Sequence, residues 1–411
     1  SSPSFTFANS VNWTLGYYYF DSIGGYRNVY FGVLEPDGVQ IPLLDLIAGR
    51  EVPLNGEVNE KGTVDTKSHA VYGQATWAIT DWFGVTLGGR YQREERGTVT
   101  AGSYLALARN PQGEVPLFIH PLESRETSNF SPKLTLDFRP FADDTLLYAT
   151  WQKGFKSGTF NVVSLNNPPA YVKPEEVTSI EAGIKGVLLD NTLVYNAAVF
   201  RNNIKDLQTL AISLTSGGTS QLLNAGEATI QGVDFDVTWQ AFPDALPGFV
   251  FTASGAYLDG EYDSFPDGAG FLQQLPQTYC GPGALLGVAC LAGDFDFTGN
   301  TTVRTPEFSG TIGISQTFEV PGGTLELGVN ATHNSGYFFD SQNTTEQPEY
   351  TLLNGRVSYL YERHNIRISL FGENLTDELY YSDKLIVDFG TNAYLAPPRT
   401  YGLTLAWSYG S

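Results

Sequence analysis

Strict alternation of apolar and polar residues, repeated in one segment after another, is the feature that most constrains this chain. In residues 233–240, valine, phenylalanine and tryptophan alternate with aspartate, threonine and glutamine, and 85–92 and 401–409 alternate in the same way. A period of two residues predicts extended strands with two unlike faces. Recurring segments of about ten residues with aromatic ends are typical of a closed membrane barrel, apolar outside and polar inside.

The composition favours one large sheet over several soluble domains. The chain has 411 residues, of which 42% are hydrophobic and 13% aromatic. No stretch approaches the roughly 18 to 20 consecutive apolar residues of a membrane helix. No linker, low-complexity tract or shift in composition divides the chain. We therefore predict an all-β fold, a transmembrane antiparallel up-and-down β-barrel that occupies residues 1–411 as a single domain.

Turn-forming residues separate fourteen predicted strands, and residues 4–8 look like the stump of one more. The fourteen are 11–21, 67–79, 83–97, 127–139, 145–156, 177–188, 191–207, 221–241, 248–261, 304–319, 323–338, 350–361, 365–381 and 399–409. Short and long connections alternate along the chain. The long ones are 22–66, 98–126, 157–176, 208–220, 262–303, 339–349 and 382–398. Outer-membrane barrels show this asymmetry, with short periplasmic turns and long loops outside, so the last strand is expected to end on the periplasmic side.

The charge and cysteine content limit the partners and the cellular compartment that suit this chain. The formal net charge of −21 makes nucleic acid a poor partner, because phosphate binding needs a basic surface. Cys280 and Cys290 are close in sequence and separated by a Gly-rich spacer, which favours a local disulfide in an oxidising compartment. A metal pair is the alternative, but no His or further Cys lies near them. Met is absent, so we expect a mature or shortened product without a signal peptide.

The polar face of the predicted strands carries charges of both signs. Eleven of these residues are expected to line the lumen: Arg90, Lys133, Asp137, Arg139, Glu181, Lys185, Asp234, Asp236, Glu326, Arg356 and Arg367. In a soluble sandwich the same face would simply meet solvent. The barrel is favoured because aromatic residues on the opposite face cluster near strand ends, as in an interfacial girdle. The girdle residues are Trp13, Tyr17, Tyr19, Trp151, Trp239, Tyr359, Tyr361 and Trp407.

Aromatic residues in the long connections, with one lysine at the outer end of the predicted strand 145–156, are the candidate ligand contacts. They are Tyr26, Tyr30, Phe31, Lys156, Phe160, Tyr171, Phe265 and Tyr279. Loop aromatics are often a binding feature, but they also pack loops against one another, and both interpretations stay open. The four histidines are scattered without metal-ligand spacing, so no metal site is expected. No catalytic or nucleotide-binding motif appears, so we expect neither an enzyme nor a cofactor.

Two segments near the end of the chain have recognisable patterns. In 400–409, Gly402, Leu405, Trp407 and Tyr409 fit the C-terminal signal that outer-membrane barrel assembly recognises. In 374–378, NLTDE matches a glycosylation acceptor by chance, and Asn374 is expected to belong to a strand bend instead.

Several segments together resemble the β-barrel part of TonB-dependent outer-membrane receptors of the siderophore-receptor-like kind. They include SPKLTLDFRPFADDTLLYATWQKGFKSGTFN (131–161) and FGENLTDELYY (371–381). The others are 173–208, 222–240, 304–315 and 352–360. No single motif is diagnostic, but their order and spacing fit across nearly the whole chain.

The resemblance implies a function and a set of partners. It implies uptake of a large scarce nutrient such as a ferric siderophore, captured by the outer loops and passed through the lumen. The implied partners are outer-membrane lipid and lipopolysaccharide, the barrel-assembly machinery, and the TonB complex acting through a plug segment. A passive or engineered diffusion pore, or a barrel subunit or scaffold of a larger outer-membrane complex, is the alternative.

The resemblance also has a gap. Such receptors carry a coupling segment and a plug before a barrel of about 22 strands, and neither precedes the barrel here. Three explanations stay open: part of a longer protein, a trimmed or engineered small pore, or a natural short relative that closes on its own strands.

Overall fold

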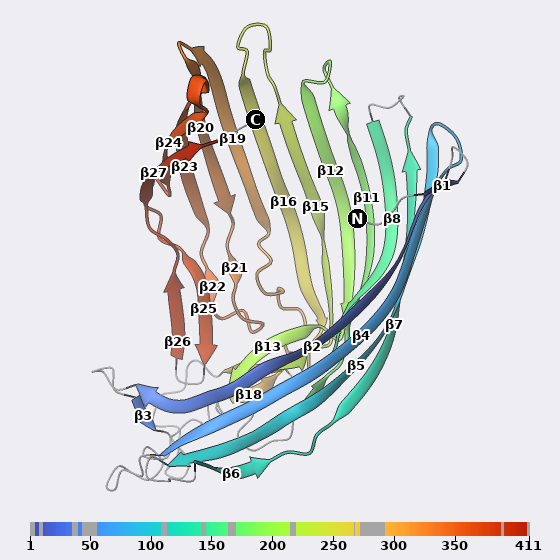
Figure 1. Cartoon of the computed structure of the whole chain (residues 1–411), viewed down its shortest axis with the longest axis vertical. Helices are drawn as coiled ribbons and strands as arrows, with labels where there is room; N and C mark the ends of the chain where they lie inside the picture. Colours follow the sequence, from blue (N-terminus) through green and yellow to red (C-terminus); the bar gives the residue numbers. More distant parts are fainter. Residues whose placement is uncertain are drawn as a thin grey trace.

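Fourteen long strands pair in chain order within one antiparallel sheet that curls around a hollow (Figure 1). The computed structural model describes residues 5–7, 11–34, 40–42, 56–107, 113–140, 145–162, 170–213, 219–266, 268–271, 292–387 and 390–408. Within these ranges, no helix is long and apolar enough to cross a membrane.

The long strands confirm the predicted up-and-down order. They are β2 (Val11–Leu34), β4 (Gly56–Ala78), β5 (Phe83–Leu107), β7 (Ser124–Phe138), β8 (Thr145–Lys156), β11 (Glu175–Leu188), β12 (Leu193–Lys205), β15 (Glu227–Trp239), β16 (Phe249–Ser264), β19 (Phe308–Val320), β20 (Gly323–Asn334), β23 (Tyr350–Tyr361), β24 (Ile366–Glu373) and β27 (Thr400–Trp407). Each pairs with the next. The predicted stump is β1 (Phe5–Phe7), which pairs with β2. Among the described strands no pairing joins β27 to β1 or β2, so this sheet has two edges.

Three strands extend farther than the alternation predicted. β2, β4 and β5 continue through much of the expected loops 22–66 and 98–126, and β6 (Glu114–Ile119) adds to β5. The pairing between β2 and β4 persists through Gly24 and Gly25 and shifts register between Tyr26 and Val29. Glycines and a shift of this kind break the two-residue pattern, so the sequence could not show these extensions.

Short two-stranded ribbons fill the long connections. They are β9 (Thr159–Asn161) with β10 (Ala170–Val172), β13 (Gln208–Ser213) with β14 (Thr219–Asn224), β17 (Gly268–Phe271) with β18 (Ala292–Phe295), β21 (Tyr337–Phe338) with β22 (Glu346–Gln347), and β25 (Tyr381–Val387) with β26 (Gly390–Leu395). β3 (Gln40–Pro42) pairs with β2. The predicted pair Cys280 and Cys290 lies outside the described residues.

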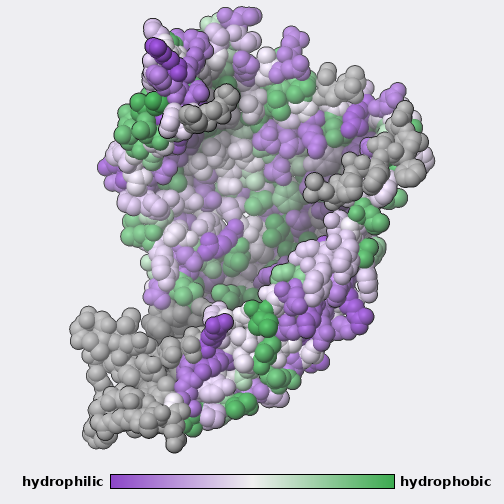
Figure 2. All heavy atoms as spheres, in the orientation of Figure 1, coloured by the Kyte–Doolittle hydropathy of each residue, from purple (hydrophilic) through white to green (hydrophobic). Residues whose placement is uncertain are grey.

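One face of the sheet is apolar although it is exposed. Residues directly opposite each other in neighbouring strands lie on the same face, so the register assigns every strand residue to one side. Leu87, Ile312, Leu370 and Leu403 share the outer face, and their exposed fractions run from 59% to 67%. A row of exposed leucine and isoleucine side chains is expected of a surface that meets lipid. Figure 2 shows the hollow on the other side, with hydrophilic residues on its wall.

The outer face also carries the aromatic residues predicted for the girdle, because all eight fall in its phase. Along β5, the outward residues change from Leu87 and Tyr91 to Arg93 and Glu95. Arg93 pairs with Glu126 of β7 at 2.7 Å. The change from apolar to paired charged side chains marks where the lipid-facing band ends at the long-loop side.

A charged side chain introduced on the outer face is expected to destabilise the folded barrel. A charged side chain introduced at the next position, on the inner face, is not. Leu87→Lys should lower the free energy of unfolding by about 2 to 4 kcal/mol, the cost of a lysine near the bilayer midplane. Urea titration of protein folded into lipid vesicles measures it.

Gly88→Glu is the control for this substitution, because Lys133 lies directly opposite Gly88 and would pair with the added carboxylate. A Cβ at Gly88 would make only ordinary contacts with Gln74 and the Gly73 carbonyl, at 3.6 Å, and the added charge would face the hollow. Equal destabilisation by Leu87→Lys and Gly88→Glu would contradict the assignment of the two faces.

Candidate functional site

The charged residues predicted for the lumen share one face of the sheet. Starting from Asp137, the register runs through Tyr148, Gly183, Ala198 and Asp234 and onward to β27. Ten of the eleven predicted residues lie in strands in this phase, namely Arg90, Lys133, Asp137, Glu181, Lys185, Asp234, Asp236, Glu326, Arg356 and Arg367. Arg139 follows β7, where its backbone N–H donates to the Trp82 carbonyl. That a ligand passes these eleven residues on its way through the lumen stays a prediction.

Some of these charges have partners on the wall itself. Arg367 on β24 lies 3.3 Å from the Glu326 carboxylate on β20. On the opposite side of the hollow, Tyr148 donates a 2.8 Å hydrogen bond to Glu181, and the Lys185 ammonium lies 5.0 Å from the centre of the Tyr148 ring. These partners reduce the cost of holding charges on the wall.

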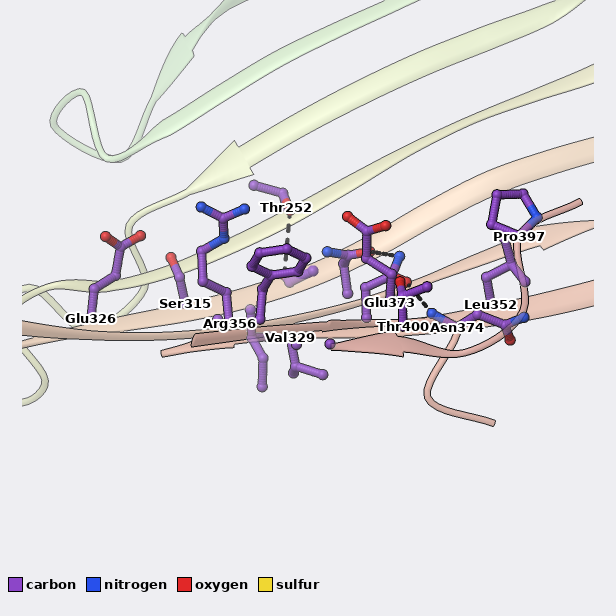
Figure 3. A pocket seen from close by; sticks show the side chains of 18 of the residues that line it. Thr252, Ser315, Glu326, Val329, Leu352, Arg356, Glu373, Asn374, Pro397 and Thr400 are labelled. Carbon is purple, nitrogen blue, oxygen red and sulfur yellow. Dashed lines mark hydrogen bonds between the residues drawn. The ribbon is translucent and has the colours of Figure 1, made fainter. Parts of the chain in front are cut away.

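A basin of about 540 Å³ lies on the inner wall, across β16 to β24 and the start of β27. Figure 3 shows Ser315, Glu326 and Arg356 rising from the same side of the sheet, whereas Val329 points to the other side. The Arg356 guanidinium lies over the Phe371 ring, 5.6 Å from its centre.

The basin includes residues that we did not single out from the sequence. The Asn354 side chain donates a hydrogen bond to the side-chain amide oxygen of Asn330 at 3.0 Å, and Phe371 and Glu373 also line the space. All four share the inward phase of the predicted charges. Extending the alternation to every residue of these strands, charged or uncharged, would have found them.

The mouth is the end of the sheet that carries connections 157–174, 206–226, 265–307, 335–349 and 374–399. Of the predicted ligand contacts, Phe160 and Phe265 are only 4% and 3% exposed. Phe265 packs on Tyr262 and Phe297, with both pairs of ring centres 5.2 Å apart. In this conformation these rings hold the mouth together, and their contact with a ligand stays a prediction.

The other predicted ligand contacts have different positions. Tyr171 packs on Phe160, 5.1 Å between ring centres, and Lys156 is exposed at the end of β8. Tyr26, Tyr30 and Phe31 fall in β2 instead of a loop. The Tyr26 side chain is 58% exposed. The side chains of Tyr30 and Phe31, and all of Tyr279, lie outside the described structure.

Amide side chains join one connection at the mouth to the next. Gln208, from β13, donates to the carbonyl oxygens of Ser157 and Lys173 at 3.0 and 2.9 Å. Farther round, Asn343 accepts a hydrogen bond from the Thr301 N–H and donates one back to its carbonyl. These amides join the connections in two pairs, and the buried cluster that contains Ala225, Phe265 and Phe297 joins the pairs, so the mouth forms one linked rim.

A cluster of cations and aromatic rings strengthens this rim, and it had no signal in the sequence. Arg304 lies 2.6 Å from the Asp383 carboxylate and 5.4 Å from the centre of the Phe339 ring. Lys384 lies 3.9 Å from the centre of the Tyr381 ring. Three separate connections supply these residues, so only the fold brings them together.

A buried carboxyl group lies in the part of β4 beyond the lipid-facing band. Glu60 is 0% exposed and lies directly opposite Ser103 of β5. Burial raises the pKa of Glu60, and the Ser103 hydroxyl across the sheet opposes that shift. The nearby Glu114 shows the reverse, because hydrogen bonds from Lys61 and Asn59 lower its pKa.

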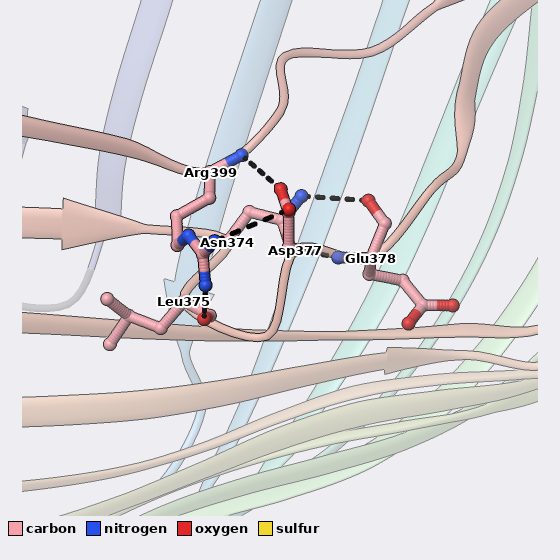
Figure 4. A network of polar contacts seen from close by, with 5 residues as sticks. All are labelled: Asn374, Leu375, Asp377, Glu378 and Arg399. Carbon is pink, nitrogen blue, oxygen red and sulfur yellow. Dashed lines mark hydrogen bonds and ion pairs between the residues drawn. The ribbon is translucent and has the colours of Figure 1, made fainter.

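The NLTDE segment forms the bend that ends β24 (Figure 4). Asn374 has a φ of 50° and Asp377 a φ of 60°, both in the left-handed region that Asn and Asp tolerate. The Asn374 side chain accepts from the Glu378 N–H and donates to the Glu378 carbonyl, both at 2.8 Å. Arg399 donates from its backbone N–H to Asp377, which ties the start of β27 to the bend. The predicted strand 365–381 therefore ends at Glu373, while the structural role expected for Asn374 is confirmed.

The predicted assembly-signal residues lie in this last strand. Gly402 faces the hollow, and Leu405 and Trp407 face outward at exposed fractions of 70% and 67%. Tyr409 lies outside the described residues, and recognition by an assembly machinery stays a prediction.

Comparison with known proteins identifies relatives along most of the chain. The family model described as "TonB dependent receptor-like, beta-barrel" matches residues 1–375. The pesticin receptors of Yersinia enterocolitica and Yersinia pestis are each 23% identical to the chain, over 360 and 361 residues. Each match covers 86% of this chain and 45% of the receptor, so the chain spans about half the length of these relatives.

Solved structures share the fold. The ferric yersiniabactin uptake receptor FyuA from Yersinia pestis has a TM-score of 0.70 at 17% identity, covering 97% of this chain and 51% of that one. The siderophore receptor PiuA from Acinetobacter baumannii has a TM-score of 0.66 at 17% identity, covering 98% and 54%. The copper transporter OprC has a TM-score of 0.57 at 14% identity, covering 86% and 54%. At these identities the likeness shows the fold alone.

Stability should depend on pH in opposite directions at the two glutamates. The pKa of Glu60 is raised in the folded protein. Below the pKa of the unfolded chain, about 4.3, the carboxyl is protonated in both states and does not affect stability. As pH rises above that value, the carboxyl destabilises the fold. Glu60→Gln should therefore raise the free energy of unfolding at pH 7 by about 1 to 3 kcal/mol, the cost of removing a polar group from water without full hydrogen bonding. The gain should vanish near pH 4.

Glu114→Gln supplies the opposite control. Its lowered pKa stabilises the fold above the unfolded value and loses that contribution as pH falls, so the substitution should destabilise at pH 7 and matter less in acid. Urea unfolding at several pH values measures both. Two variants with the same sign at pH 7 would contradict this assignment.

Removing the Asn374 side chain should loosen the bend and β27 with it. Asn374→Ala loses two hydrogen bonds and places alanine at a positive φ, so the free energy of unfolding should fall by about 2 kcal/mol. Asn374→Gly keeps the φ and loses only the bonds, so its loss should be smaller. Unfolding by urea, followed by tryptophan fluorescence, tests this order. The reverse order would show that the left-handed backbone is not the constraint.

Proposed function

The chain belongs to the TonB-dependent receptor β-barrel family, whose members are transport receptors of the bacterial outer membrane, and we propose that the whole protein imports a large scarce nutrient. The observation that carries this proposal is one curled sheet, apolar outside and charged inside, that the family model matches over residues 1–375. Transport of a large solute needs a wide polar route across the membrane, and a sheet of this kind builds one. No covalent chemistry belongs to the proposal.

The proposed nutrient is a ferric siderophore or a similar metal chelate. Among similar structures, FyuA is a ferric yersiniabactin uptake receptor and PiuA a siderophore receptor, although OprC is a copper transporter. The exposed Tyr26 and Lys156 and the linked rim would meet such a ligand first. An aromatic ring and a cation at a rim suit a bulky ligand that carries charge.

The rest of the machinery is part of the same proposal. Residues 1–411 would form one barrel domain whose two edges pair with further strands of the whole protein, because an unpaired edge is costly in lipid. A plug and a coupling segment would link transport to the TonB complex. Lipopolysaccharide would contact the charged outer residues beyond the aromatic girdle, and the last strand would direct assembly.

Energy-dependent uptake is the expected result in cells. Iron-starved bacteria that produce the whole protein should accumulate radioactive ferric chelates, such as ferric citrate or a ferric catecholate, only when TonB is present. An isogenic strain without TonB is the control. Equal accumulation in both strains would contradict energised uptake and favour a passive pore.

A further inference from the structure

The inner wall has two arginines in the β20 to β24 region, and their surroundings differ. Arg367 forms an ion pair with Glu326, whereas the ion pairs among the described residues do not include Arg356. The contact found for Arg356 is the face of the Phe371 ring, at 5.6 Å. A guanidinium stacked on a ring keeps its N–H groups in the plane free to donate, and it is held in one orientation.

Space lies directly beside this guanidinium because the residue opposite it has no side chain. The register pairs Arg356 with Gly328 of β20, and Gly328 with Ser315 of β19. A Cβ built at Gly328 would come no closer than 4.0 Å to Ile314 and Ser315. The basin is therefore open where an anion would meet Arg356, and a larger residue at Gly328 would fill it without strain.

Polar groups surround that space. The side-chain Oδ1 of Asn330 accepts the Asn354 hydrogen bond, so the Nδ2 hydrogens of Asn330 are the donors left to that side chain. Thr252 and Ser315 add hydroxyl groups to the lining. Two carboxylates also line the basin: Glu373 disfavours an anion near itself, and the charge of Glu326 is compensated by its ion pair with Arg367.

We propose that Arg356 and its basin bind a carboxylate group on the inner wall. A carboxylate is planar and accepts two parallel N–H bonds from a guanidinium, and the space over Gly328 has room for it. In a chain of net charge −21, binding of an anion depends on such a local cation. The carboxylate belongs either to the transported chelate or to a protein segment that occupies the hollow.

The inference rests on the proposed uptake function only in taking this wall as the ligand's route. Binding to purified protein and accumulation by cells are measured separately, so one can fail without the other.

Citrate is the probe, titrated by calorimetry into the purified whole protein in detergent. Arg356→Ala should weaken citrate binding about tenfold, the loss expected for a charge-assisted hydrogen bond. Arg356→Lys should retain part of the affinity, and Gly328→Val should weaken binding while the charge stays unchanged. The double variant Arg367→Ala with Glu326→Gln is the matched control and should stay within about twofold, because it removes a guanidinium together with the carboxylate that it compensates.

A photoreactive phenylalanine at Thr252 distinguishes the two sources. If a protein segment holds the site, citrate should not bind the wild type, and the probe should capture a peptide containing Asp or Glu, with lower yield in Arg356→Lys. Equal loss of citrate binding in Arg356→Ala and in the Arg367→Ala, Glu326→Gln double variant would overturn the proposal. So would the absence of both citrate binding and peptide capture.

Discussion

Hydrogen bonding between neighbouring strands is the constraint on which the rest of this structure depends. In a membrane each backbone N–H and C=O needs a partner within the protein, and antiparallel pairing from β2 to β27 supplies one for nearly every residue of the strands between the two edges. Once the register is set, the side of every side chain is set with it, because a slip of one residue would exchange the two faces. The exposed Leu87 and Leu403 and the inward Arg356 follow from the same pairing.

At the mouth a different kind of contact holds the protein together. The connections there cannot rely on long ladders, so side chains such as Gln208 and Asn343 bond to the backbone of neighbouring connections. Arg304 and Asp383 add a charged contact between two of them. Linking one connection to the next makes the rim a single unit, and a ligand that moves one part of it would act on its neighbours.

The inner wall contains charged side chains with charged or polar partners and one, Arg356, that belongs to none of the ion pairs among the described residues. Glu326 and Arg367 form an ion pair. Tyr148 donates a hydrogen bond to Glu181, and its ring contacts the Lys185 ammonium. Arg356 lies over the Phe371 ring and beside the open space at Gly328. Its guanidinium can therefore reach a ligand, whereas that of Arg367 is already paired. This contrast between two arginines one strand apart gives the wall its most specific chemical feature.

The sequence by itself determined the strand order, the two faces and the phase of the lumen charges, because alternation is a local property that each segment carries alone. It also placed the Asn374 bend, since the residue types that tolerate a left-handed backbone are few. It missed the extensions of β2, β4 and β5, where Gly24 and Gly25 hide the period. Only the tertiary structure decided which loop aromatics are buried, which charges are paired, and that Gly328 faces Arg356. Those facts depend on residues from different strands meeting in space, and no local pattern records such a meeting.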